Sequence, residues 1–424
     1  MRPLVQSRIL LSLILAAAAG AAAPPLAEPL DGAAPSPAPA SVAPPSVPAD
    51  WRTPSGSMPL AVIEAVLAER DGRLVLLGGL DSAFEATAAI QILDPRQGWL
   101  PIGSQLGVPR AGARSVMLHD GRVAILGGFA GAVASPVHHE DGELLDPLVA
   151  GSSRVIEGFG GSLEGLTATP LPAHLALVAA GDRVRVLDLA TLGWSEPAAL
   201  SPPRRHHLAI PLGDGQVLLL GGADSAAAPI ATLVRTSSED PTAPPIVEEI
   251  AIDDASASFP ARLRHAASAP IEGGVIIAGG LDPESLRTSE RLWRFDEASR
   301  SLGALPSLPQ ATGASHLLLA SIDQGVVVVG GEWRVGAARG PADFSLVLER
   351  DPSDRAAWRW RSLPPLPVSG SRRMLRRTAE GGVEILGGYR FRDRREAEET
   401  SLPPGATFDP RRYRLSLAPF AAGD

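Results

Sequence analysis

The chain has 424 residues, of which 45% are hydrophobic, a formal net charge of −9 and no cysteine. The acidic balance argues against a broad nucleic-acid-binding surface, and the missing cysteine excludes disulfides and cysteine-linked lipids. A chain of this length can bury a core large enough to hold its fold by packing alone.

Residues 1–23 are predicted to be a secretory signal peptide. Arg2 and Arg8 precede an apolar run from Ile9 to Ala19, and small residues that suit cleavage follow. The run is short for a membrane span, and no later apolar stretch has membrane length. We therefore expect an exported protein, periplasmic or extracellular, with no transmembrane segment after signal cleavage. Residues 24–50 are mostly Ala, Pro and Ser, which predicts a disordered linker.

Beyond the linker, a short apolar run that ends in two small residues recurs seven times. The doublets are Gly78-Gly79, Gly127-Gly128, Ala180-Gly181, Gly221-Gly222, Gly279-Gly280, Gly330-Gly331 and Gly387-Gly388. Each run is typical of a buried strand, and upstream turns such as Asp71-Gly72 make it the second strand of a hairpin. The glycines are expected to turn the chain out of the sheet and to let a neighbouring backbone come close.

A second apolar strand ending in Asp follows most doublets, and an aromatic residue comes soon after it. Ile90–Pro95 before Trp99 is one example, and a Pro-rich stretch then leads into the next repeat. The repeat is about fifty residues long, which is the length of a propeller blade rather than of a helical repeat. Four strands in each of seven repeats predict a seven-bladed β-propeller over residues 51–424.

In this order of elements the chain resembles the kelch-repeat family, over roughly residues 58 to 420. The resemblance implies an all-β, seven-bladed kelch-type β-propeller with four antiparallel strands per blade. It leaves function open, because such propellers include binding scaffolds, oxidases and sugar isomerases. Two repeats depart from the pattern and are expected to be irregular. The third has Ala180-Gly181, and the fourth has Leu233-Val-Arg235 in place of the Asp-bearing strand.

Several kinds of catalytic chemistry find no support in the sequence. Galactose-oxidase-like members of the family use a copper site with a tyrosine crosslinked to a cysteine, and this chain has no cysteine. No nucleophile elbow, His-Glu-x-x-His motif or phosphate loop occurs. We predict no cofactor and no metal site, and interpret His138-His139-Glu140-Asp141 as a solvated loop.

Strand parity predicts one functional face. The loops after the doublets share a face with the residues that open the first strand of each repeat, and the longest of them cover 129–142, 223–232 and 389–404. Counting back fourteen or fifteen residues from each doublet reaches positions rich in His and Arg near the central channel. The candidate ligand-binding residues are Glu64, His207, Arg264, His265, His316, Arg372 and Arg373.

Such a ring suits a carboxylate, a sulfate or an acidic sugar, because Arg binds oxyanions through its planar fork. The preferred alternative is structural, with these side chains bonded to neighbouring backbone. The arginine-rich stretch from Arg355 to Arg414 is interleaved with acidic residues. We interpret it as paired surface charge, with an anion-binding edge as the alternative.

We predict an exported, monomeric, non-enzymatic propeller that presents a loop face to a protein or a cell-surface glycan and does not bind nucleic acid. The alternative is an enzyme similar to carbohydrate mutarotases or epimerases, acting on an acidic sugar at the channel mouth with a His as general acid or base.

Overall fold

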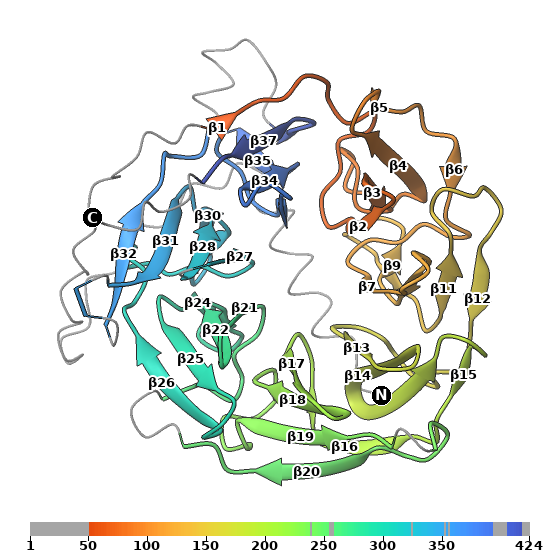
Figure 1. Cartoon of the computed structure of the whole chain (residues 1–424), viewed down its shortest axis with the longest axis vertical. Coiled ribbons are helices and arrows are strands. Elements are labelled where there is room, and N and C mark those ends of the chain that lie inside the picture. Colours follow the sequence, from red (N-terminus) through yellow and green to blue (C-terminus); the bar gives the residue numbers. More distant parts are fainter. Residues whose placement is uncertain are drawn as a thin grey trace.

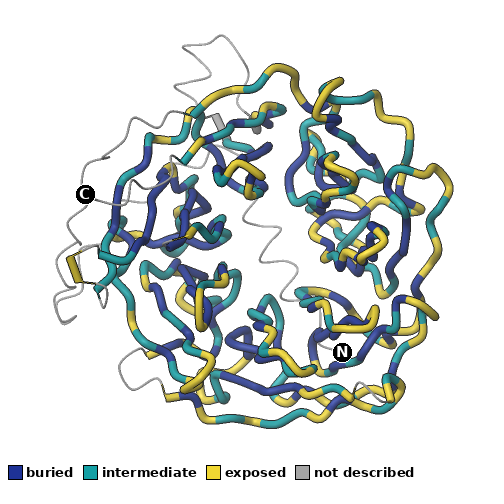
Figure 2. Tube along the Cα trace, in the orientation of Figure 1, coloured by how far each residue is buried: buried dark blue, intermediate teal, exposed yellow. Residues whose placement is uncertain are grey.

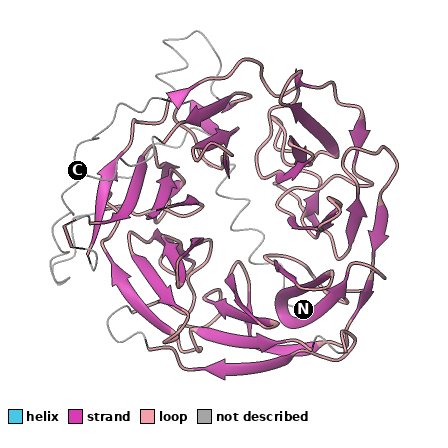
Figure 3. Cartoon of the chain, in the orientation of Figure 1, coloured by secondary structure: helices cyan, strands magenta, loops and turns pink. Residues whose placement is uncertain are grey.

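The computed structural model describes residues 51–237, 240–253, 258–323, 325–351, 353–354, 357–392 and 405–417. The predicted signal peptide and linker, and the greater part of the predicted loop 389–404, lie outside these residues. Strands are the regular elements of this part of the chain (Figure 3), and none of its segments forms a helix long and apolar enough to cross a membrane.

The main antiparallel sheets follow one another in chain order around a common centre (Figure 1). The first consists of β2 (Val66–Arg70), β3 (Arg73–Leu77), β4 (Ala89–Asp94), β5 (Gly98–Trp99) and β6 (Ser104–Gln105); the second of β7 (Arg114–Met117), β8 (Val123–Leu126), β11 (Gly142–Leu145) and β12 (Arg154–Ile156); the third of β13 (Thr167–Leu171), β14 (Leu175–Asp188), β15 (Gly193–Trp194) and β16 (Ala198–Arg204). The fourth consists of β17 (Leu208–Gly213), β18 (Gln216–Leu220), β19 (Ala231–Arg235) and β20 (Ile246–Ile250); the fifth of β21 (Ala267–Ile271), β22 (Gly274–Ala278), β25 (Leu292–Asp296) and β26 (Ser301–Leu305); the sixth of β27 (Leu318–Ile322), β28 (Gly325–Val329), β31 (Ser345–Arg350) and β32 (Trp358–Ser362). The last consists of β33 (Met374–Arg377), β34 (Val383–Leu386), β37 (Arg412–Leu415) and β1 (Trp51–Arg52). The predicted all-β propeller fold is confirmed.

The first described strand belongs to the last sheet. In β1, Trp51 pairs with Leu415 and Arg52 with Arg414, so β1 becomes the outer strand beside β37. The indole Nε1 of Trp51 also donates to the carbonyl of Pro364, at 3.1 Å. Residues from the two ends of the described chain therefore share one sheet.

The second strand of each sheet forms the core, as the apolar runs predict. Val123–Leu126 are fully buried, and Figure 2 shows buried backbone concentrated along the middle of each sheet. The hairpin turns also agree with the sequence. Asp71 and Gly72 have φ of 51° and 73°, and both central residues of a tight hairpin turn of this hand need positive φ.

Several glycine doublets join their sheet to the next one. The Gly280 amide donates to the carbonyl of Ala314 in the following repeat, at 2.9 Å, and the Gly79 amide donates to the carbonyl of Arg110 at 2.8 Å. A Cβ at Gly279, where φ is +63°, would stand 2.1 Å from the same Ala314 oxygen. Glycine is therefore needed at Gly279 for two reasons: its φ is positive, and the backbone of the next repeat leaves no space for a Cβ.

Replacing Gly279 by alanine is expected to lower the free energy of unfolding by at least about 2 kcal/mol, because both φ and the contact with Ala314 oppose the new Cβ. Gly336 is the matched control, since its φ of +62° is nearly the same and nothing lies within 4 Å of its built Cβ. Gly336→Ala should cost only about 1 kcal/mol, the strain of φ alone. Urea unfolding of both variants tests this, and equal losses would contradict the contact argument.

The third sheet is irregular as predicted. β14 continues through Ala180-Gly181 without leaving the sheet, pairs with β13, β15 and β16, and has a register shift between Gly181 and Arg183. The fourth sheet is also irregular, but in its first hairpin, where the register of β17 and β18 shifts between Pro211 and Gly213, and not in the strand that departs from the sequence pattern. Ala231–Arg235 pairs in full with both β18 and β20, because an apolar strand needs no Asp to complete its ladder.

Small sheets lie beyond several doublets. The chain forms a hairpin of β9 (Phe129–Ala130) and β10 (Val137–His138), within the predicted loop 129–142. Another consists of β35 (Tyr389–Arg392), in the predicted loop 389–404, and β36 (Gly405–Phe408), just after it. A third sheet joins the insertions of two repeats through β23 (Leu281–Asp282), β24 (Arg287–Thr288), β29 (Glu332–Val335) and β30 (Ala338–Pro341). Sequence analysis did not predict this link.

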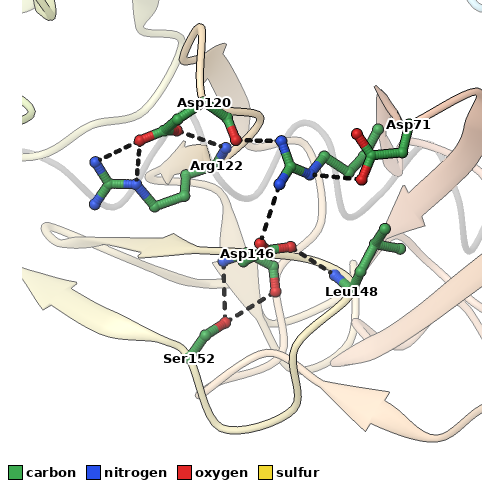
Figure 4. Close-up of polar contacts among 7 residues, drawn as sticks. Asp71, Asp120, Arg122, Asp146, Leu148 and Ser152 are labelled. Carbon is green, nitrogen blue, oxygen red and sulfur yellow. Dashed lines mark hydrogen bonds and ion pairs between the residues drawn. The ribbon is translucent and has the colours of Figure 1, made fainter.

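At the opposite end of the sheets, where the strand-one to strand-two turns lie, polar contacts join the first two sheets. Arg70 donates to the carbonyl of Asp120 and pairs with Asp146 at 3.5 Å. Figure 4 shows how the Leu148 amide donates to Asp146 Oδ1 at 3.0 Å, while the Ser152 hydroxyl accepts from the backbone amide of Asp146 at 3.0 Å and donates to its carbonyl at 2.9 Å. Arg70 of the first sheet thus pairs with an Asp146 carboxylate that the loop after β11 holds in place.

Candidate functional site

One residue from each main sheet lies two positions before the first strand and has a left-handed backbone conformation. These residues, the inner ring, are Glu64, Gly112, Gly165, His206, His265, His316 and Arg372, with φ between 52° and 65°. Only two of the seven are glycines. The strain of positive φ at the other residues is offset by the hydrogen bonds described next.

Backbone hydrogen bonds link the inner ring from sheet to sheet. The His206 amide donates to Gly165 O at 2.8 Å, the His265 amide to His206 O at 3.1 Å, and the His316 amide to His265 O at 3.2 Å. First strands of neighbouring sheets contact one another, so the ring lies on the inner side of the sheets. Successive side chains of the ring are therefore held side by side.

His206, His265 and His316 form a stack of three imidazoles, the histidine stack. The ring centroids of His206 and His265 lie 4.1 Å apart, and those of His265 and His316 lie 4.3 Å apart at an interplanar angle of 30°. Ser315 Oγ lies 3.1 Å from His316 Nδ1. Within the described part of the chain, the buried His316 Nε2 has no hydrogen-bond partner.

The histidine stack is neutral at neutral pH. Burial, aided by the positive charge of Arg114, lowers the pKa of His206 to about 3. Burial also holds the pKa of His265 and of His316 well below the ordinary value, with smaller effects from His206 and Arg372 respectively. Each imidazole therefore offers one N–H donor and one acceptor nitrogen.

Arg372, the next ring position, is paired with two carboxylates. Its Nη1 lies 2.7 Å from Glu64 Oε1, and its Nε lies 3.5 Å from Glu332 Oε2. Burial would lower the pKa of Arg372, but Glu64 and Glu332 more than offset it and raise the pKa. The guanidinium predicted to bind an anion thus already has acidic partners, and the ring carries donors and acceptors of both signs.

Aromatic side chains lie next to this charged cluster. Tyr389 bridges to Ser371, the residue before Arg372, and its ring lies 5.4 Å from Phe84 and 5.8 Å from Phe408. Burial raises the pKa of Tyr389, and the charge of Glu332 adds to this shift. A packed aromatic cluster therefore lies beside the polar groups of the inner ring.

The sequence prediction places His207 at the ring, but the structure brings His206 there instead. His207 is 5% exposed and its Nε2 lies 2.7 Å from Thr167 Oγ1, between sheets, where burial lowers its pKa to about 3. The hairpin of β17 and β18 carries a register shift between Pro211 and Gly213. The extra residue moves the ring position from fourteen to fifteen residues before the doublet.

Arg373 and Arg264 also lie outside the inner ring. Arg373 is buried, donates to Gly387 O at 3.2 Å and to the carbonyl of Val368, and stacks over Tyr413. Arg264 binds Asp224 Oδ1 at 2.6 Å. Of the predicted residues, the structure thus brings together Glu64 and Arg372 at one part of the ring and His265 and His316 at another.

Buried arginines donate hydrogen bonds to the carbonyls of several doublets, a role that was not predicted from the sequence. Arg110 Nη1 donates to Gly127 O at 2.9 Å, and Arg204 Nη1 donates to Gly221 O at 2.6 Å, as Arg373 does to Gly387. Arg110 and Arg204 both follow a proline. The recurring Pro-Arg pair in the sequence could have indicated these residues. The arginine of the pair donates a hydrogen bond to the carbonyl of the first doublet glycine of its own sheet.

Among the described residues, no group of three or more His, Asp or Glu side chains is arranged to hold a metal ion. In the acidic and histidine-rich loop, His139 Nε2 contacts Pro109 O at 2.9 Å and its Nδ1 lies 3.8 Å from Asp141. Through His139 this loop therefore contacts the backbone that leads into the first strand of its own sheet.

Comparison with known proteins supports the fold. The chain is similar to the solved structure of YjhT, with a TM-score of 0.51 and 14% identity over 72% of this chain and 98% of that one. It is also similar to a fungal alcohol oxidase of the AA5 family in complex with copper, with a TM-score of 0.62 and 12% identity over 87% of this chain and 76% of that one. No protein-family model and no curated protein sequence matches the chain. At these identities the likeness establishes a kelch-type propeller fold and no more.

Proposed function

We propose that this protein is an exported binding propeller whose inner ring binds a cell-surface glycan. The observation that carries the proposal is the histidine stack, held at equivalent positions of three consecutive sheets and followed by Arg372 with its two carboxylates. Rigid sheets fix these groups while the loops beyond the doublets are free to vary.

The charge balance favours a neutral sugar over the acidic ligand considered from sequence. Sugar hydroxyls both donate and accept, and the ring offers neutral imidazoles, a guanidinium and carboxylates within one cluster. Because Glu64 and Glu332 already neutralise Arg372, an added carboxylate would meet two acidic groups there.

A titration of neutral and acidic oligosaccharides from a glycan array, followed by calorimetry on any hit, tests the proposal. Glu64→Gln and His265→Ala should each weaken binding of a neutral glycan at least tenfold, since each removes a polar group of the ring. His119→Ala is the matched control, because His119 is exposed on the β7–β8 turn at the other end of the sheet. An array with no hit, or a hit that neither ring variant weakens, would overturn the proposal.

A second candidate, sugar mutarotation or epimerisation, is favoured by His316. Its Nε2 has no hydrogen-bond partner among the described residues and can exchange a proton with a bound sugar, although the lowered pKa of His316 makes it a weak base. Anomer exchange of the bound sugar, followed by NMR, separates the two functions. A rate that rises with the protein and is lost in His316→Gln would favour the enzyme, and a rate equal to that in buffer would favour binding alone.

A further inference from the structure

A row of charged side chains crosses the whole last sheet. Strand pairing places Arg376 opposite Glu384, Glu384 opposite Arg414, and Arg414 opposite Arg52. Directly paired residues project from the same face of a sheet, so the four side chains lie on one side. We call these residues, with Arg412 two positions before Arg414, the arginine row.

The arginine row contains more positive than negative charge. Glu384 is fully buried and receives Arg376 Nε at 2.8 Å and Arg412 Nη1 at 3.2 Å, while Arg414 Nε remains 3.6 Å away. Within the described residues, Arg52 has no ion-pair partner, and the buried Nε atoms of Arg412 and Arg414 have no hydrogen-bond partner. Like charges directly opposite across strands, as in Arg52 and Arg414, destabilise a sheet.

The arginine row lines a cavity of about 670 Å³ between the last and the first sheets. Arg52, Arg376, Arg412 and Arg414 form one wall together with Glu380. The facing wall includes the exposed Pro95 and the paired Leu74 and Leu93, of which only 1% and 4% is exposed. The lining includes Gly72 and Ser416, so the cavity lies at the turn end of the sheets, away from the doublets that bear the inner ring.

We propose that this cavity binds a small organic carboxylate that carries an apolar group. The carboxylate would lie between Arg52 and Arg414, where it would screen their repulsion and accept charge-assisted hydrogen bonds from the guanidinium groups. The apolar group would pack on Pro54 and Pro95 and along the aliphatic stems of the arginines. A volume of this size suits a ligand of that kind, and the site is independent of the glycan function proposed above.

Octanoate is the probe, with acetate and octan-1-ol as its anionic and apolar halves. Calorimetric titration of the full chain should give octanoate an affinity at least tenfold higher than either half, because only octanoate meets both walls. Arg52→Gln and Arg414→Gln should each weaken octanoate at least tenfold. Arg235→Gln is the matched control, since Arg235 lies in the third strand of another sheet and pairs with Glu248.

Thermal unfolding without ligand separates lost binding from lost folding. Arg52→Gln should leave the melting temperature unchanged or higher, because it removes a repulsion. Equal binding of octanoate to the wild type and to both arginine variants would overturn the proposal. So would equal affinities for octanoate and octan-1-ol, which would reduce the site to an apolar surface.

Discussion

Replacing Arg110 by methionine is expected to lower the free energy of unfolding by about 3–5 kcal/mol, one of the two largest effects that the structure predicts. Arg110 is 2% exposed, and its Nε binds Glu143 Oε1 at 3.0 Å while its Nη2 binds Asp141 Oδ1 at 2.6 Å. Glu143 is also 2% exposed, so the substitution leaves a buried carboxylate without its cation. Urea unfolding followed by circular dichroism measures the loss.

A double variant tests the cause. Arg110→Met combined with Glu143→Gln should recover at least about 1 kcal/mol of the loss, because the stranded charge is then gone. Arg122→Gln is the control, since Arg122 pairs with Asp120 on an exposed turn and should change stability by no more than about 0.5 kcal/mol. A loss below about 1.5 kcal/mol for Arg110→Met, or no recovery in the double variant, would contradict the argument.

The second large effect is a steep loss of stability in mild acid. The pKa values of His206 and His207 are about 3, and those of His265 and His316 are well below the ordinary value near 6.5. Below pH 6.5 the unfolded chain therefore binds protons at these four residues that the folded chain does not. The free energy of unfolding should fall with decreasing pH by up to about 1.4 kcal/mol per pH unit for each histidine.

Urea unfolding between pH 7 and pH 5 measures this dependence before most carboxylates titrate. The contribution of each histidine is complete above pH 6.5 and is lost progressively toward its folded pKa. The slope of unfolding free energy against pH measures the number of protons taken up on unfolding. His207→Gln should lower that number by about one, whereas His119→Ala, at an exposed residue, should leave it unchanged. NMR titration of the folded protein that placed all four imidazole pKa values near 6.5 would contradict the prediction.

The fold could be predicted because its determinants are local and repeated. A buried strand after an Asp-Gly turn and before a glycine doublet needs only neighbouring residues to define it. The doublets also have a steric cause that sequence alone implies, since the Gly279 contact with Ala314 tolerates no Cβ. The place of β1 could not be predicted in this way, because Trp51 and Arg52 form a two-residue strand with no doublet of their own.

The candidate site was predicted only in part, because its geometry depends on single residues of register. Counting from the doublets finds His265 and His316, but one added residue in the β17–β18 hairpin selects His206 in place of His207. The added residue places the His207 side chain between two sheets, beside Thr167, and not in the inner ring. The partners of Arg372 come from different repeats, and no spacing rule brings Glu64 and Glu332 to the same guanidinium.

The arginine row was also predicted only in part, because one of its residues is distant in the sequence. The arginine-rich stretch was interpreted as paired surface charge, and Arg376 and Arg412 do pair with Glu384. Arg52, far away in the sequence, adds the charge that this pairing leaves uncompensated. Only the strand register of the last sheet reveals the excess.

The pairing of β1 with β37 also sets an order in time. Ribosomal synthesis makes Trp51 long before Leu415, so the outer strand of the last sheet must wait for almost the whole domain before its partner exists. Until then two strand edges stay open, and closing them carries the entropy of a very long loop. The pairing of β1 is thus coupled to the synthesis of β37.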